Sequence, residues 1–190
     1  EISSFQLDRC FQFAPDIAVL VNITPDHLDR YEYKFENYIH SKFRIFQNAK
    51  AATTCIYWGD DEVIQQYKNL IPASTQKQEI HFAPATGSAT ITEQEIIFEA
   101  GRIQRASAPI QGPHNAMNMS AAILAATAAG VSWESIIQHL PTFQNAPHRL
   151  EPCGEWNGVR FINDSKATNV DAVYYALNSF NQPIILIIGG

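Results

Sequence analysis

The sequence predicts an α/β fold in which a mostly parallel sheet is flanked by helices and extended by a small antiparallel meander. Apolar runs too short for helices, such as DIAVLVNI at residues 16–23, are typical of strands buried on both faces of a parallel sheet. Segments with apolar residues every three or four positions, typical of amphipathic helices, alternate with these runs. From residue 79 to 110 the segments become short and alternating, which indicates antiparallel strands.

Two predicted strand–helix pairs fill the first part of the chain. The strand over 16–23 is followed by an aromatic-rich helix over 34–49, in which apolar residues recur at helical spacing. A strand over 53–58 is followed by a helix over 60–70, with acidic residues in its first turn, where they complement the helix dipole.

The predicted meander comes next. It consists of the segments EIHFAP, ATITEQEIIFE and RIQRASAPI, separated by turns at Thr86-Gly87 and Ala100-Gly101. We expect these segments to form an antiparallel extension of the parallel sheet.

Two further helices are predicted after the meander. The first covers 112–130, where Pro113 suits the first helical position, the alanines favour helix and Gly130 suits the stop. The second covers 132–140 and begins at Ser132, a preferred N-cap residue.

The end of the chain is predicted to begin a second domain. Residues 141–151 contain two prolines and are interpreted as a linker, so that residues 1–145 form one domain and 146–190 the start of another. A hairpin at Asn157-Gly158, the strand VRFIN, the helix VDAVYYALNSF and the strand PIILII together predict a right-handed βαβ unit of Rossmann-like type. Because the chain opens on EISSFQL and closes on an apolar strand with a glycine pair, we expect a piece of a longer protein.

Composition excludes several function classes. The net charge is -6 and no run of Lys or Arg exists, which argues against nucleic-acid binding. No apolar stretch approaches the ~20 residues of a membrane span. The three cysteines, Cys10, Cys55 and Cys153, have neither disulfide-framework nor zinc-site spacing, so we expect reduced thiols in a cytoplasmic protein.

Polar side chains gather after the first predicted strand. Asp26, His27 and Arg30 follow it directly, and ligands of open α/β folds bind at the carboxyl edge of the sheet. The pattern is explained equally well by a helix start, with Asp26 near the dipole and Arg30 paired to it.

Lys42 shares a helix face with apolar residues, among them Tyr38, Ile39 and Phe46. Lysines usually extend out of such faces into water. A lysine held back would have its neutral amine favoured by desolvation. Such an amine could take up carbon dioxide to form a carbamate, an oxygen ligand for a hard cation such as Mg²⁺.

Two further polar groups lie at predicted element ends. Asn115 and Asn118 are three residues apart in the first turns of the helix over 112–130, where amides and the helix N-terminus can bind a nucleotide or simply cap the helix. The second group follows VRFIN or lies in the linker, and its members can bind ligand or serve as turn residues: Arg149, Asp164, Lys166 and Thr168.

Several motifs, in this order and at these separations, resemble the Mur ligase family: EISSFQL, NITPDHLDRY, SKFRIFQNAK, GPHNAMN, HRLE and NDSKATN. Members are ATP-dependent amide-bond-forming enzymes of peptidoglycan precursor synthesis. SSFQL and NDSKATN resemble specifically the members that add D-glutamate to UDP-N-acetylmuramoyl-L-alanine through an acyl phosphate. The resemblance implies the family's central ATPase-like domain and the start of its C-terminal domain.

The resemblance implies a role for each matched residue. Glu1, His27 and carbamylated Lys42 would hold two Mg²⁺ ions, with Lys42 and His27 also counted as catalytic. Ser3 and His27 would contact the muramoyl-alanine substrate. The implied ATP ligands are Asn115, Asn118, Arg149 and Asp164. Lys166 and Thr168 would face the phosphates and the incoming amino acid, with Lys166 catalytic.

The chain lacks the GKS/GKT phosphate loop that a Mur ligase needs, since none of its glycines precedes a lysine. We therefore expect the isolated chain to be inactive. Separately, we expect its full-length parent to be a monomer that acts on small molecules. Two alternatives stay open: another ligase of the same superfamily, such as a folylpolyglutamate synthase, or a non-enzymatic structural module.

Overall fold

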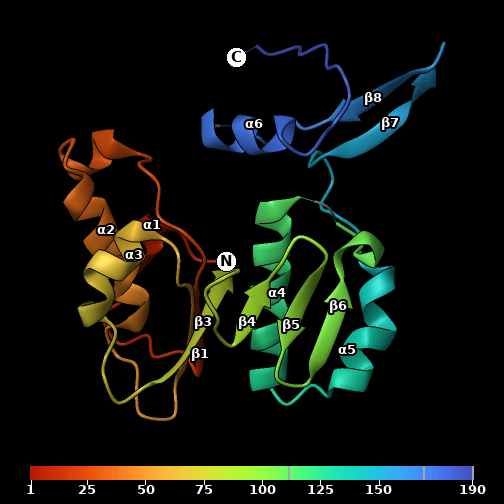
Figure 1. Ribbon diagram of the computed structural model, residues 1–190. Coiled ribbons are helices and arrows are strands. Elements are labelled where there is room, and N and C mark those ends of the chain that lie inside the picture. Colours follow the sequence, from red (N-terminus) through yellow and green to blue (C-terminus); the bar gives the residue numbers. More distant parts are fainter. Residues whose placement is uncertain (111, 169, 190) are drawn as a thin grey trace.

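A computed structural model describes residues 1–110, 112–168 and 170–189 (Figure 1). Asn169, the last residue of the NDSKATN motif, and Gly190 of the terminal glycine pair lie outside this description. Within it, no helix is both long and apolar enough to cross a membrane.

A six-stranded sheet forms the first and larger part of the structure, with its strands in sequence order. The first four strands are mutually parallel, and the last two continue antiparallel. The strands are β1 (Ile17–Leu20), β2 (Thr54–Trp58), β3 (Gln76–Phe82), β4 (Ala89–Ile91), β5 (Glu95–Phe98) and β6 (Gly101–Gln104). This sheet confirms the predicted class, a mostly parallel sheet with an antiparallel extension.

The boundaries predicted for the meander were wrong in two respects. EIHFAP belongs to β3, which pairs in parallel with both β2 and β4, so Thr86-Gly87 is not a hairpin turn. ATITEQEIIFE is not one strand but two, β4 and β5, because Thr92 closes a turn between them by accepting the amides of Gln94 and Glu95 on its hydroxyl.

Helices cover both faces of the sheet, which explains why β2 is buried along nearly all of its length. In β2, Cys55 and Tyr57 face a core built with α2 and α3, and Ile56 between them faces the core on the other side. The helices are α1 (Ser4–Leu7), α2 (Phe35–Phe43), α3 (Glu62–Tyr67), α4 (Pro113–Ala128) and α5 (Trp133–His139), and short 3₁₀ turns over Arg44–Phe46 and Lys68–Leu70 extend α2 and α3. Figure 1 shows α2 and α3 to the left of the strands, α4 behind them and α5 at the right.

The helix signals in the sequence act as predicted at α4 and α5. Gly112 precedes α4 with φ 100°, Pro113 takes its first turn, and Gly130 ends the segment with φ 88°. The Ser132 hydroxyl caps α5 by accepting a hydrogen bond from the Ser135 amide.

The chain then leaves the large sheet and forms a separate hairpin. β7 (Glu151–Trp156) and β8 (Val159–Asn163) pair antiparallel as a two-stranded sheet, and α6 (Val170–Leu177) follows. Asn157 and Gly158 both have positive φ, 50° and 78°, as a two-residue hairpin turn requires, so the predicted turn is confirmed.

The strand predicted for PIILII is not found, and neither is the βαβ unit. Residues 181–189 form no ladder with any described strand, and Ile185 and Ile187 are 88% and 89% exposed. A βαβ unit would require PIILII to pair in parallel with β8, but the described partner of β8 is the antiparallel strand β7. An apolar run of this kind needs neighbouring strands and a cover before it becomes a buried strand, and the described residues supply neither.

Candidate functional site

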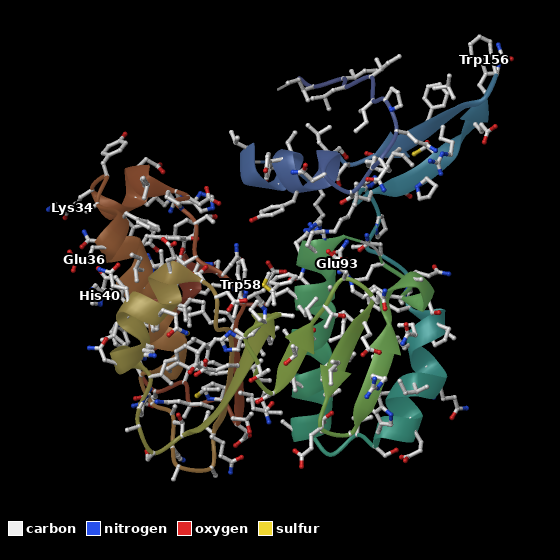
Figure 2. All side chains as sticks on the ribbon, in the orientation of Figure 1. Lys34, Glu36, His40, Trp58, Glu93 and Trp156 are labelled. Atoms are coloured by element: carbon white, nitrogen blue, oxygen red, sulfur yellow. The ribbon has the colours of Figure 1, made fainter. Side chains whose placement is uncertain are left out.

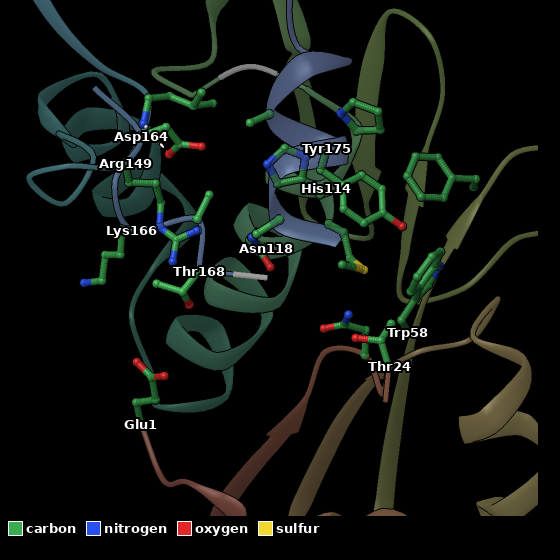
Figure 3. Close-up of a pocket in the computed structure, with 18 residues that line it drawn as sticks. Glu1, Thr24, Trp58, His114, Asn118, Arg149, Asp164, Lys166, Thr168 and Tyr175 are labelled. Atoms are coloured by element: carbon green, nitrogen blue, oxygen red, sulfur yellow. Dashed lines mark hydrogen bonds between the residues drawn. The ribbon is translucent and has the colours of Figure 1, made fainter. Parts of the chain in front are cut away.

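A cavity of about 470 Å³ lies where the carboxyl ends of β1, β2 and β3 meet the first turns of α4 and the segments around β8 and α6 (Figure 3). This is the edge at which ligands of parallel α/β sheets bind. The residues that line it and carry polar or aromatic groups are Glu1, Asn22, Thr24, Trp58, Phe82, His114, Asn118, Arg149, Asp164, Lys166, Thr168 and Tyr175.

The structure brings most of the predicted nucleotide-site residues into this one cavity. Two come from the first domain of the prediction, Glu1 and Asn118, and four come from beyond residue 146: Arg149, Asp164, Lys166 and Thr168. Ser3, His27, Lys42 and Asn115 do not line it.

Of the two asparagines predicted at the start of this helix, only Asn118 reaches the cavity. Asn115 is only 5% exposed, whereas Asn118 is exposed and lines the cavity. The reason is that α4 packs lengthwise on β1 to β4, which draws the Asn115 stripe toward the sheet. The face that α4 presents to the cavity is instead built from His114, Met117 and Asn118.

Hydrogen bonds fix the linker against the loop after β8. Asp164 Oδ1 accepts the Leu150 amide at 2.9 Å, and the Lys166 amide donates to the His148 carbonyl at 3.0 Å. His148 and Leu150 both have positive φ, so the linker turns sharply on either side of Arg149. These bonds hold Arg149, Asp164 and Lys166 on the same side of the cavity (Figure 3).

His114 is a site residue that the sequence interpretation passed over. Its ring packs against Tyr175 of α6 with centroids 5.4 Å apart, and its Nδ1 is buried without a described hydrogen-bond partner. Burial, helped by the nearby positive charge of Arg149, lowers the pKa of His114. The neutral form of an imidazole in the wall of the cavity is therefore favoured.

Five other lining residues were not predicted from the sequence: Asn22, Thr24, Trp58, Phe82 and Tyr175. The first four directly follow or end an apolar strand run, which is a usable signal because strand carboxyl ends share an edge. Tyr175 carries no comparable signal, since its position depends on how α6 lies over α4.

Lys42 is partly buried beside an aromatic ring, which corresponds to the held-back alternative rather than to the usual extension into water. Its Nζ lies 5.4 Å from the centre of the Tyr38 ring, and burial lowers its pKa while the charges of Asp26 and Glu1 oppose that shift. Burial also raises the pKa of Tyr38 to about 12. The carboxylates of Asp26 and Glu1 therefore lie within electrostatic reach of an amine whose neutral form is favoured.

His27 sits at a strained turn beside this lysine helix. Its backbone is left-handed with φ 51°, its ring packs on Phe5 at 5.0 Å, and its Nε2 lies 3.6 Å from Asp26 Oδ2. Arg30 lies over the same Phe5 ring at 4.6 Å, which is its observed partner in place of the Asp26 considered from the sequence. Among the described residues, no three His, Cys, Asp or Glu side chains converge closely enough to hold a metal ion.

Ser3 has a structural role that the sequence did not reveal. It caps α1, accepting the Gln6 amide on its hydroxyl while the Gln6 side chain accepts the Ser3 amide at 2.8 Å.

A polar network joins the end of α1 to α2, the helix that carries Lys42. Ser41 donates to Asp8 Oδ1 at 2.7 Å, and the Tyr31 hydroxyl donates to Asp8 Oδ2 at 3.0 Å. This network fixes α1 against α2 immediately beside Lys42.

Comparison with known proteins gives a consistent picture. Residues 1–126 match the Mur ligase middle domain. The UDP-N-acetylmuramoylalanine–D-glutamate ligase of Cytophaga hutchinsonii is 47% identical over all of this chain, and the protein of the same name from Bacteroides fragilis is 43% identical. The chain covers 44% of each of these relatives.

Solved structures share the fold at lower identity. A MurF structure from Acinetobacter baumannii superposes with a TM-score of 0.74 at 23% identity, over 88% of this chain and 38% of that one. MurF ligase from Thermotoga maritima in complex with ADP gives a TM-score of 0.72 at 16% identity, over 94% and 42% of the two chains.

Proposed function

The chain belongs to the Mur ligase family, and from that premise we propose that it forms part of an ATP-dependent ligase that adds D-glutamate to UDP-N-acetylmuramoyl-L-alanine. The observation that carries the proposal is the similarity of all of this chain, at 47% and 43% identity, to about 44% of the length of relatives named for that reaction. The cavity supports it independently, because it gathers the cations, amides and aromatic rings that a nucleotide needs.

The chemistry of the cavity fits ATP. Its volume lies in the range of about 300–1,000 Å³ usual for small-molecule sites. Arg149 and Lys166 line it and form no ion pair with another described residue, so both charges can face phosphates. Asn118 lies near the start of α4, a helix end that favours anions. We propose that Arg149, Asp164 and Asn118 bind the nucleotide.

We propose that Glu1, His27 and Lys42 hold two Mg²⁺ ions after Lys42 has become a carbamate. The fit to this chain rests on the lowered pKa of Lys42 and on the nearby carboxylates of Asp26 and Glu1, since a carbamate would add the oxygen donor that the described side chains lack. Bound magnesium would neutralise charge between the two anionic reactants. The polar network of Asp8, Ser41 and Tyr31 would keep the two helices aligned for that purpose.

The remaining contacts are assigned by similarity of motif. We propose that Ser3 and His27 lie near the acceptor carboxylate, and that Lys166 and Thr168 face the phosphates and the incoming D-glutamate. Lys166 would stabilise the charge that develops as the acyl phosphate forms. Asn115 is buried and does not line the cavity, so its proposed role toward ATP is to position the first turn of α4.

We further propose a domain boundary near residue 145, a monomeric state and a cytoplasmic location. The boundary is supported by the two separate sheets, since the larger ends at Gln104 and the smaller begins at Glu151. Closure about the linker would bring Arg149 and Lys166 onto the nucleotide and exclude water.

An assay of the full-length ligase tests the proposed reaction. With ATP, Mg²⁺ and UDP-N-acetylmuramoyl-L-alanine, phosphate release is expected with D-glutamate and not with L-lysine, diaminopimelate or L-glutamate. Omission of the UDP substrate is the control for uncoupled ATP hydrolysis.

Two outcomes would replace this proposal. Phosphate release only with L-glutamate and a folate would assign the chain to a folylpolyglutamate synthase-like activity. No release with any amino acid, in a protein that is folded and does not bind ATP, would favour the non-enzymatic alternative.

A further inference from the structure

His81 of β3 lies between two carboxylates on opposite sides of its ring. Its Nδ1 is 2.6 Å from Asp60 Oδ1 and its Nε2 is 3.1 Å from Glu79 Oε2. Ionised carboxylates only accept hydrogen bonds, so both ring nitrogens must donate. The side chain is 14% exposed, which makes this a largely enclosed imidazolium held by two charge-assisted hydrogen bonds.

The surrounding backbone leaves room for this ring. A Cβ atom at Gly59 would lie 2.1 Å from His81 Cε1, and one at Gly87 would lie 2.7 Å from His81 Cδ2. Any side chain at either position would displace the imidazole. Neither glycine has a positive φ, so close approach is what requires glycine here: of the ring at Gly59, and of both the ring and the Glu79 carbonyl oxygen, which would lie 2.4 Å from such a Cβ, at Gly87.

The same carboxylate reaches the wall of the cavity. Asp60 Oδ2 accepts the Phe82 amide at 2.6 Å and lies 3.4 Å from Trp58 Nε1. Trp58 and Phe82 both line the cavity, and their rings meet edge to face at 6.1 Å. Trp58 lies at the ends of the central strands, facing the segments around α6 (Figures 2 and 3).

We propose that His81 is a positioning residue whose imidazolium fixes Asp60, and through Asp60 fixes the Trp58–Phe82 wall of the cavity. Loss of the His81 charge releases the Asp60 side chain and loosens that wall. The consequence for ligand affinity rests on the proposed nucleotide function. The structural coupling between His81 and Trp58 does not.

The charged and titratable groups around His81 favour the protonated ring. Asp60 and Glu79 face the ring directly. The Tyr57 hydroxyl donates to Glu79 at 2.6 Å, and the charge of Lys68, in the 3₁₀ turn after α3, helps to lower the pKa of Glu79. The two carboxylates outweigh the effect of burial and raise the pKa of His81, and the pKa values of Asp60 and Glu79 are lowered in turn.

An NMR titration of the 190-residue chain tests the structural coupling without any variant. Imidazole ¹⁵N shifts of His81 should show both nitrogens protonated at neutral pH, with a midpoint above that of a free histidine. The Trp58 indole N–H resonance should move with the same midpoint. A neutral His81 ring at pH 7, or an indole resonance that ignores the His81 midpoint, would overturn the proposal.

His81→Gln then tests the consequence, with His139→Gln as the matched control. In His81→Gln the pH-dependent shift of the Trp58 indole should vanish, and in full-length ligase the KM for ATP should rise about tenfold with kcat little changed, the size of one lost charge-assisted hydrogen bond. Circular dichroism confirms that both variants are folded. If the ligase turns over and the KM for ATP is unchanged in His81→Gln, the positioning role is wrong. If the wild-type enzyme shows no ligase activity, the proposed function fails instead, and the indole titration still decides the coupling.

Discussion

Asp61 ties three elements together at the rim of the cavity, and its removal should destabilise the fold measurably. The residue is 8% exposed. Its Oδ1 caps α3 by accepting the Ile64 amide at 2.8 Å, and its Oδ2 accepts the Ile23 amide at 3.2 Å. Ile23 lies between Asn22 and Thr24, which line the cavity, so Asp61 links the helix cap to the site.

The expected magnitude follows from these two bonds. Loss of an N-cap costs about 1 kcal/mol, and a buried amide left without a partner costs about 1–3 kcal/mol. Asp61→Ala should therefore lower the free energy of unfolding by about 2–4 kcal/mol. Asp61→Asn keeps a capping oxygen but replaces the second acceptor with a donor, so it should lose about 1–3 kcal/mol.

Urea unfolding of the chain measures both values. The midpoints should fall in the order wild type, Asp61→Asn, Asp61→Ala, with an unchanged m-value. Glu99→Ala, at an exposed turn position, is the control and should stay within about 0.5 kcal/mol of wild type. Faster hydrogen exchange at the Ile23 amide should accompany the loss in both Asp61 variants. An Asp61→Ala midpoint equal to that of Glu99→Ala would refute the reasoning.

Three further predictions concern the charged groups and the close contact at the rim. The pKa of His81 is raised in the folded state above its ordinary 6.5. The stability that the protonated ring contributes is therefore complete below pH 6.5 and is lost as the pH rises through the raised pKa. Urea midpoints should fall over that pH interval in wild type and stay flatter in His81→Gln. Gly59→Ala would bring a methyl group onto the His81 ring and should cost about 1–3 kcal/mol in thermal unfolding, whereas Gly189→Ala, with open space around it, should change nothing. Lys42→Ala should reduce ligase turnover about 100-fold or more, with partial rescue by short carboxylates, and mass spectrometry should find an added carboxylate on wild-type Lys42 only; full activity in Lys42→Ala would exclude the carbamate.

The fold was predictable wherever local pattern and burial agree. The run at 16–23, the amphipathic segment at 34–49 and the Pro113 and Gly130 signals gave the right element types, because each reflects sterics or burial within a few residues. PIILII failed for the opposite reason. A strand is defined by its partner, and an apolar run carries no information on whether a partner lies beside it.

The sequence predicted at which edge of the sheet the site lies, but not in which direction the individual side chains point. Placing Asp164, Lys166 and Thr168 after a strand was enough to bring them to the cavity, since the loop keeps them close together. The sequence could not predict that Asn115 is buried and Asn118 exposed. Side chains three residues apart on a helix point only about 60° apart, and the packing of α4 on the sheet decides which of them is covered. Tyr175 and His114 depend on how α6 lies over α4, a contact between segments far apart in the chain.

The cavity rim explains how a chain of net charge -6 can present positive charge to a ligand. Three aspartates at the rim use their oxygens on backbone amides: Asp60 on Phe82, Asp61 on Ile23 and Ile64, and Asp164 on Leu150. A carboxylate that accepts such bonds braces the strand ends, and the charge of Asp60 is further balanced by the His81 ring at 2.6 Å. Arg149 and Lys166 are consequently left without a described ion pair, although acidic residues stand close by. Negative charge thus organises the backbone of the rim, and positive charge remains for the cavity itself.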